Sequence, residues 1–292
     1  MLSHAQQEHI RQIEIITQKL FFGRFGGDHV TRRRGLGAEF YQLREYVCGD
    51  DIRFVDWKSS ARLGHLLTRE CFQDKNRTII IALDISNSQR CGRHKTKVSA
   101  AQDAAAVLTF AALHAHDRVG LILFSDKIHT HLPPATGYGH ASWLIQSIYE
   151  SYAHGTTDLA GALASTGSFY RQDAIVFIIS DFIAPDFKNE LAWLAQRTDA
   201  IAIRCLDEVE RSFPTIGCIQ ICDSEKGQLI DVDAYAAQHA LTSALSHRLT
   251  AQNAIFSSNG IDCLDIQTND DICAQLVQFF RKRTLVGGYI SS

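Results

Sequence analysis

From residue 77 onward the chain alternates short apolar runs with helical segments, and this alternation constrains the fold more than any other feature. The predicted strands cover 77–84, 118–125, 174–181, 200–206 and 260–267, and the predicted helices cover 97–116, 139–152, 158 onward, 186–197, 233–258 and 269–283. Strands that are continuously apolar are buried on both faces, and strands that alternate with helices pair in parallel. We therefore expect an α/β fold with a doubly wound, mostly parallel central sheet flanked by helices.

The first 75 residues have a different pattern. Isoleucines at 10, 13 and 16 recur at helical spacing and predict a helix over 5–20. A loop rich in glycine and arginine follows at 23–38, and its basic stretch at 31–35 is either an anion-binding or a solvated segment. We expect one N-terminal part, residues 1–75, with this helix, the basic loop and a small β subdomain, and a second domain over residues 76–292.

Charge and hydropathy exclude several classes of protein. The formal net charge is −3, so no overall basic field favours nucleic acid as a partner. No apolar run reaches the roughly 18–20 residues that span a bilayer. The N-terminus lacks the apolar core of a signal peptide. These features predict a cytoplasmic protein with no transmembrane segment.

Oxygen-bearing side chains stand where the predicted strands end. Parallel strands bring their carboxyl ends to one edge of a sheet, where α/β folds bind ligands. Carboxylates and hydroxyls are the ligands that Mg²⁺ prefers. Any one of these segments could equally be a turn or a helix cap. The segments are Asp84, Ser86 and Ser88 after 77–83, Thr156, Thr157 and Asp158 before the helix at 158, and Ser180 and Asp181 after 174–179.

Together the three segments resemble the metal-ion-dependent adhesion site of the von Willebrand factor A domain. "DISNS" is similar to its D-x-S-x-S motif, "GTTDLAGAL" to its second loop and "IISDF" to its third. The resemblance implies that Ser86, Ser88 and Thr157 bind Mg²⁺, or Mn²⁺ or Ca²⁺, directly. Asp84 and Asp181 would act mainly through bound water. A sixth position would accept an acidic side chain of a partner. Asp158 is better explained as a helix cap than as a ligand.

A denser pattern precedes the predicted sheet. Residues 37–69 resemble the signature of the bacterial family called domain of unknown function 58, which joins this segment to a von Willebrand A-like domain. Cys48 replaces the usual proline, and Val55 replaces isoleucine. The matching residues are Gly37, Glu39, Arg44, Tyr46, Gly49, Asp50, Asp51, Arg53, Asp56, Trp57, Ser60, Ala61, Arg62, Gly64, Leu66 and Arg69.

The signature alternates arginines with carboxylates, which pair bidentately and fix orientation. We interpret Glu39, Arg44, Asp50, Asp51, Arg53, Asp56, Arg62 and Arg69 mainly as a structural network that braces a small β subdomain against the sheet. Trp57 is expected to pack on a neighbouring layer. A partner-binding surface is the second interpretation, and catalysis is the third.

The resemblance implies a metal-dependent adaptor or co-chaperone that works with a MoxR-type AAA+ ATPase. The chain has no G-x-x-x-x-G-K-[ST] loop, so that partner would have to hydrolyse the ATP. The alternative is a metal-dependent hydrolase or phosphatase that uses the same carboxylates. Ser86 stands where a haloacid-dehalogenase-type enzyme has its second aspartate, and no G-x-S-x-G motif occurs. We therefore expect a binding module rather than an enzyme. His154, near the second segment, is expected to be a surface residue.

Overall fold

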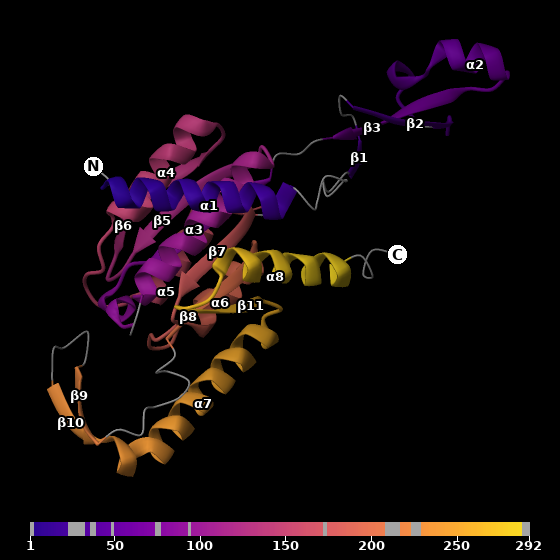
Figure 1. The fold of residues 1–292 in the computed structure, drawn as a ribbon. Helices are drawn as coiled ribbons and strands as arrows, with labels where there is room; N and C mark the ends of the chain where they lie inside the picture. Colours follow the sequence, from indigo (N-terminus) through magenta and orange to yellow (C-terminus); the bar gives the residue numbers. More distant parts are fainter. Residues whose placement is uncertain are drawn as a thin grey trace. The chain divides into compact units, whose positions relative to one another are not determined.

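The computed structural model describes residues 3–22, 33–35, 39–47, 50–73, 77–92, 95–171, 174–207, 217–222 and 229–287. The chain divides into two compact units (Figure 1). The sheet unit comprises Met1–Arg24 and Arg77–Ser292, and the signature unit comprises Phe25–Asn76.

A six-stranded sheet forms the centre of the sheet unit. Its strand order is β11-β8-β7-β4-β5-β6, and every neighbouring pair is parallel except β5 and β6. The strands are β4 (Thr78–Asp84), β5 (Arg118–Phe124), β6 (Ile128–Ala135), β7 (Ala174–Ser180), β8 (Asp199–Leu206) and β11 (Asp262–Gln267). The predicted α/β class with a mostly parallel sheet is confirmed.

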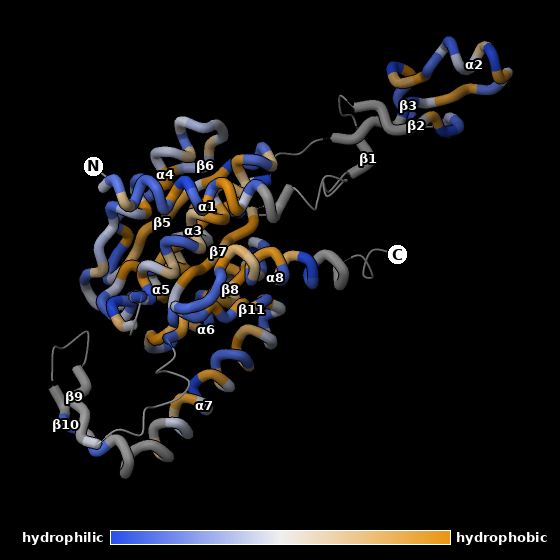
Figure 2. Tube along the Cα trace, viewed as in Figure 1, coloured by the Kyte–Doolittle hydropathy of each residue, from blue (hydrophilic) through white to orange (hydrophobic). Residues whose placement is uncertain are grey.

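Helices cover both faces of this sheet. Ile81 and Leu83 of β4 contribute to one apolar cluster, whereas Ile80 and Ala82 contribute to the other. Successive strand residues point to opposite faces, so a strand buried on both sides must be apolar throughout. Figure 2 shows apolar residues along the central strands. The first cluster includes residues of α1 (His4–Phe22), α3 (Lys97–His114), α4 (Tyr138–Glu150) and α8 (Ile272–Gly287), and the second includes residues of α5 (Leu159–Phe169), α6 (Lys188–Ala195) and α7 (Ala234–Ser258).

Helix α1 groups with the sheet unit, which differs from the expected division at residue 75. Its Ile13 is buried in the first apolar cluster, and the hydroxyl of Thr17 lies 3.8 Å from the thiol of Cys273 in α8. Ile13 and Thr17 of α1 are buried in the sheet unit, whereas Ile16 of the expected stripe is 43% exposed, so one side of this helix belongs to the sheet unit's core. A hairpin of β9 (Cys218–Cys222) and β10 (Leu229–Asp233) precedes α7.

The signature unit is built on a three-stranded antiparallel sheet of order β1-β3-β2. Its elements are β1 (Arg33–Gly35), β2 (Glu39–Glu45), the 3₁₀ turn η1 (Ile52–Phe54), α2 (Trp57–Leu63) and β3 (Leu67–Gln73). Helix α2 begins at the cap of Asp56 and ends at Gly64, whose φ of 78° places it in the left-handed region that glycine adopts without strain. The basic segment at 31–35 is described only for residues 33–35, which pair with β3.

Candidate metal centre

The first predicted segment forms a tight buried turn after β4. The backbone N–H of Ser86 donates to Oδ1 of Asp84 at 2.8 Å, and the hydroxyl oxygens of Ser86 and Ser88 lie 2.9 Å apart. All three side chains are buried. Ligands at about 2.0–2.1 Å in the octahedron of Mg²⁺ lie about 2.9 Å from their neighbours. The spacing of the two hydroxyls therefore suits adjacent positions on such an ion.

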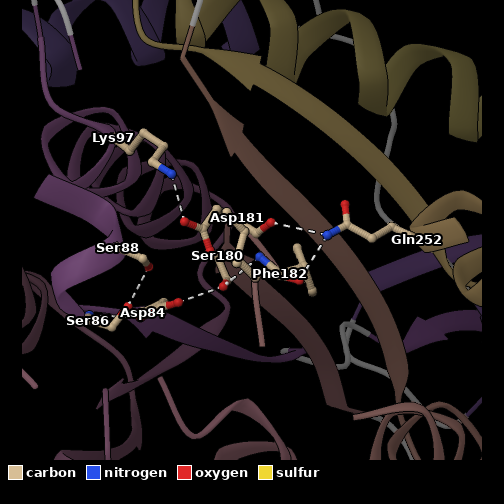
Figure 3. A network of polar contacts seen from close by, with 9 residues as sticks. Asp84, Ser86, Ser88, Lys97, Ser180, Asp181, Phe182 and Gln252 are labelled. Atoms are coloured by element: carbon tan, nitrogen blue, oxygen red, sulfur yellow. Dashed lines mark hydrogen bonds and ion pairs between the residues drawn. The ribbon is translucent and has the colours of Figure 1, made fainter. Parts of the chain in front are cut away.

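The third segment meets the first through a side-chain hydrogen bond. The hydroxyl of Ser180 donates to Oδ2 of Asp84 at 2.6 Å and accepts the backbone N–H of Phe182 at 3.0 Å (Figure 3). The carboxylate of Asp181 is fully buried, and its Oδ1 accepts the N–H of Ile183 at 3.1 Å. β7 lies directly beside β4, which brings these two strand ends together.

The second segment is held at the same edge by its backbone. The N–H of His154 donates to the carbonyl of Ile85 at 2.8 Å, and the carbonyl of Gly155 accepts the N–H of Asn87 at 3.0 Å. Thr157, two residues further on, is buried. The structure thus brings all three predicted segments to the carboxyl edge of the sheet. Asp158 accepts the N–H of Gly161 at 2.9 Å, which confirms it as the cap of α5.

Gly155 is needed in this segment for two reasons. Its φ of 75° is in the left-handed region, and a Cβ added there would lie 3.0 Å from the Asp126 carboxylate and from the Ser125 hydroxyl. A larger residue would be strained and would displace the segment from β5. The segment therefore packs closely on the end of β5.

A buried lysine is the main feature that the sequence did not reveal. Nζ of Lys97, the first residue of α3, donates to Oδ2 of Asp181 at 2.7 Å (Figure 3). The side chains are 2% and 0% exposed. A charge this deeply buried is tolerated only when it is paired. The ammonium therefore supplies one positive charge inside the candidate centre.

The electrostatics favour a further cation. Burial raises the pKa of Asp84 to about 6, and the nearby charge of Asp181 raises it as well. A carboxylate whose ionised form is disfavoured by burial and by a neighbouring negative charge is stabilised by a nearby cation. The carboxylates of Asp84 and Asp181 and the hydroxyls of Ser86 and Ser88 are hard-oxygen donors of the kind that Mg²⁺ prefers, and the segment that carries Thr157 lies at the same edge. Among the described residues, no three His, Cys, Asp or Glu side chains are arranged to hold a metal, so such an ion would depend on the hydroxyls.

The buried side-chain amide of Gln252 holds the third segment through a hydrogen bond to its backbone. Nε2 of Gln252 in α7 donates to the carbonyl of Phe182 at 2.9 Å, and its Oε1 accepts Nη1 of Arg204 at 2.8 Å. Arg204 is itself buried and forms a bidentate ion pair with Asp265 of β11. Phe182 has a φ of 55°, which is unusual for a residue other than glycine. The amide therefore helps to hold a strained turn beside Asp181.

In the signature unit, three of the predicted arginine–carboxylate pairs form. Arg44 binds Asp50 through two hydrogen bonds of 2.7 Å each, and that pairing holds the pKa of Asp50 below its usual value. The other two pairs are Arg53 with Asp51 and Arg69 with Asp56.

Asp56 has two roles in this unit. Its Oδ1 caps α2 by accepting the N–H of Ser59 at 3.0 Å, and its Oδ2 accepts Nε of Arg69 at 3.0 Å. This carboxylate therefore joins the start of α2 to β3 within the signature unit. By contrast, the Arg53 side chain is 82% exposed in its pair with Asp51.

Other signature residues do not join this network. Trp57, the first residue of α2, is 62% exposed, so it does not pack into the described part of its own unit, and its packing on a neighbouring layer stays a prediction. Arg62 is exposed and makes no hydrogen bond or ion pair with the residues that the structure describes. Glu39 lies in β2, and its side chain, like Gly37, Cys48 and Gly49, is outside the described part.

Comparison with known proteins places the chain among uncharacterized relatives. Uncharacterized proteins of Mycobacterium tuberculosis and Mycobacterium bovis are each 28% identical over 289 residues, which cover 96% of this chain and 91% of the relative. Two solved structures resemble 70% of the chain. One is the conserved hypothetical protein BatB from Bacteroides thetaiotaomicron, with 15% identity, a TM-score of 0.44 and 98% of that chain covered. The other is an aerotolerance-related membrane protein from Bacteroides fragilis, with 16% identity, a TM-score of 0.45 and 99% covered.

None of the helices that the structure describes combines the length and the apolar character needed to cross a bilayer. The family model of the proteins of unknown function DUF58 matches residues 42–254, which include most of the signature, all three segments of the candidate centre and the buried Gln252. The chain belongs to the DUF58 family.

Proposed function

We propose that this protein is a metal-dependent protein-interaction module of the von Willebrand A type, in which Mg²⁺ at the candidate centre binds an acidic side chain of a partner. The observation that carries the proposal is the convergence of three oxygen-bearing segments around the buried Asp84. Ser86, Ser88 and Thr157 would hold the ion directly. The ion would supply a Lewis-acidic position for an incoming carboxylate.

The occupied oxygens of Asp84 favour binding over catalysis. One oxygen accepts the N–H of Ser86, and the other accepts the hydroxyl of Ser180. A carboxylate engaged at both oxygens and fully buried is poorly placed to attack a substrate. The hydrolase alternative needs such a nucleophile or a metal-bound water with a base beside it. We therefore keep the interaction module as the proposed function.

For the partner, we propose a MoxR-type AAA+ ATPase or another protein that presents an acidic side chain. The choice of this partner rests on the resemblance of residues 37–69 to the signature of the DUF58 family. The exposed apolar side chains of the signature unit, Val47, Ile52, Trp57, Leu63 and Leu66, would add apolar contact area to such an interaction.

Titration calorimetry with MgCl₂ tests the metal site. We expect wild type to bind Mg²⁺ and Asp84→Asn to bind it at least tenfold more weakly, because the amide keeps the shape of the side chain but removes its charge. Asp117→Asn is the matched control, since Asp117 precedes β5 at the opposite edge of the sheet. Equal Mg²⁺ affinity in wild type and Asp84→Asn would refute the metal site. Pull-down of the ATPase with Mg²⁺ and with EDTA then tests the partner separately.

A further inference from the structure

Two histidines beside the candidate centre face each other. Nδ1 of His129, in β6, lies 3.2 Å from Nε2 of His154, in the loop before α5. The ring centroids are 4.2 Å apart, and the planes are inclined by 66°. The His129 side chain is 19% exposed and His154 is exposed, so solutes can reach the pair. The pair lies outside the donor set proposed for Mg²⁺.

The partners of His154 determine which of its nitrogens carries a proton. Nδ1 of His154 lies 2.6 Å from the carbonyl oxygen of Tyr152. A carbonyl only accepts, so this nitrogen must be the N–H donor. In the neutral ring, Nε2 then presents a lone pair toward His129.

The partners of His129 likewise determine which of its ring nitrogens carries a proton. Nε2 of His129 lies 2.7 Å from the hydroxyl oxygen of Ser125 and 3.3 Å from Oδ1 of Asp126. The Ser125 hydroxyl donates to that same carboxylate oxygen at 2.9 Å. Its oxygen can therefore accept from His129, and the anionic carboxylate favours an N–H over a lone pair at Nε2. The neutral ring then leaves a lone pair on Nδ1.

Two lone pairs at 3.2 Å repel each other unless a cation lies between them. The cation is either a proton, which makes one ring an imidazolium, or a metal ion. Two nitrogens about 2.0–2.1 Å from a tetrahedral ion lie about 3.3 Å apart, close to the separation found here.

The geometry points to a second metal site, in which His129 and His154 bind a divalent transition-metal ion such as Zn²⁺ or Ni²⁺ through Nδ1 and Nε2. Imidazole nitrogens select these ions, whereas the all-oxygen centre selects Mg²⁺. Histidines that bind metals usually donate their other ring N–H to a carboxylate or carbonyl, which is the arrangement of Asp126 and Tyr152. The remaining coordination positions face solvent and are open to water or to a donor from a partner.

This site would join the start of β6 to the loop that carries Thr157. It does not depend on the proposed function, because its ligands and its preferred ions differ from those of the candidate Mg²⁺ centre. The test therefore keeps MgCl₂ in large excess, so that a hard-oxygen site is occupied throughout. A failure of Mg²⁺ binding and a failure of the histidine site are then seen in separate experiments.

The test is a Zn²⁺ titration of the full chain in excess MgCl₂, comparing wild type with His129→Asn, His154→Asn and the matched control His131→Asn. His131 lies on the same strand and contacts the hydroxyl of Tyr170 instead. We expect each of the first two variants to bind the tightest Zn²⁺ equivalent at least tenfold more weakly, and the control to match wild type.

Cobalt spectroscopy separates imidazole from thiolate ligands, which matters because Cys91 is exposed. We expect bound Co²⁺ in wild type to show visible bands without thiolate charge transfer, and these bands to vanish in His129→Asn. Unchanged Zn²⁺ affinity in both histidine variants, or a thiolate spectrum at the tightest site, would overturn the proposal. The proposal would also be overturned if NMR showed that His129 and His154 share a proton at neutral pH and that Zn²⁺ does not shift the signals of either ring.

Discussion

Replacing Lys97 by methionine tests how the candidate centre balances its charge. The substitution keeps most of the apolar stem and removes the ammonium that lies 2.7 Å from Asp181. Both side chains are almost completely buried. Removing one partner of a buried ion pair typically costs about 3–5 kcal/mol, because the other charge stays buried alone. Without divalent cations we therefore expect the free energy of unfolding of the sheet unit to fall by about that amount.

Magnesium should restore part of this loss. An ion at the centre replaces the missing positive charge and no longer meets the repulsion of the ammonium. We expect Lys97→Met to bind Mg²⁺ at least tenfold more tightly than wild type, which corresponds to about 1.4 kcal/mol of additional stabilisation at saturating ion. The stability difference between the two proteins should therefore shrink when MgCl₂ replaces EDTA.

Urea unfolding followed by tryptophan fluorescence measures this difference. Of the three tryptophans, Trp57 lies in the signature unit, so a Trp57→Phe background leaves Trp143 and Trp193 to report on the sheet unit. Lys95→Met is the matched control, because Lys95 pairs with Asp103 outside the centre. The reasoning is refuted if Mg²⁺ stabilises wild type, Lys97→Met and Lys95→Met equally, or if Lys97→Met costs nothing in EDTA.

Two further predictions concern the signature unit and the edge of the sheet opposite the centre. Asp56→Ala should lower the melting temperature of the signature unit by several degrees, because it removes both the cap of α2 and the partner of Arg69. Arg53→Ala should leave the melting temperature nearly unchanged, because the ion pair of Arg53 is exposed. Scanning calorimetry of both variants checks this contrast. Burial raises the pKa of Asp117 in the folded protein above its value of about 3.9 in the unfolded chain. The folded protein therefore loses stability through this group as the pH rises from the unfolded pKa to the folded pKa. Asp117→Asn should be more stable than wild type at pH 7, with a difference that vanishes below pH of about 4, and urea midpoints at both pH values decide the matter.

The spacing of apolar residues predicted most of the secondary structure, because most buried positions of a strand or helix are occupied by apolar side chains. The run from Ile79 to Leu83 is apolar throughout because its members alternate between the two clusters. Strand β6 was not among the predicted strands, and its Pro133 and Pro134 are unsuited to a central strand. Among the described strands it stands at one end of the sheet order, and proline is tolerated on an edge strand.

The sequence predicted the segments of the candidate centre but not the side chains that support them. Lys97 follows the helix cap Thr96 and has the pattern of an exposed first-turn lysine. Its partner Asp181 lies 84 positions further along the chain, and the contact exists only because α3 starts where β7 ends. Gln252 likewise belongs to an α7 pattern with no local sign that it reaches the carbonyl of Phe182. Pairing across such distances is fixed by tertiary packing, which no periodicity encodes.

The charge of Lys97 bears directly on what the centre would bind. Asp84, Asp181 and Lys97 together carry one negative charge when both carboxylates are ionised. A divalent ion would turn this into one positive charge in a site with little water to screen it. A carboxylate from a partner would then complete a neutral set, whereas two carboxylates without the lysine would already neutralise Mg²⁺. The buried ammonium therefore favours an anionic partner over a neutral one, and Lys97→Met should bind the metal more tightly while binding an acidic partner less tightly.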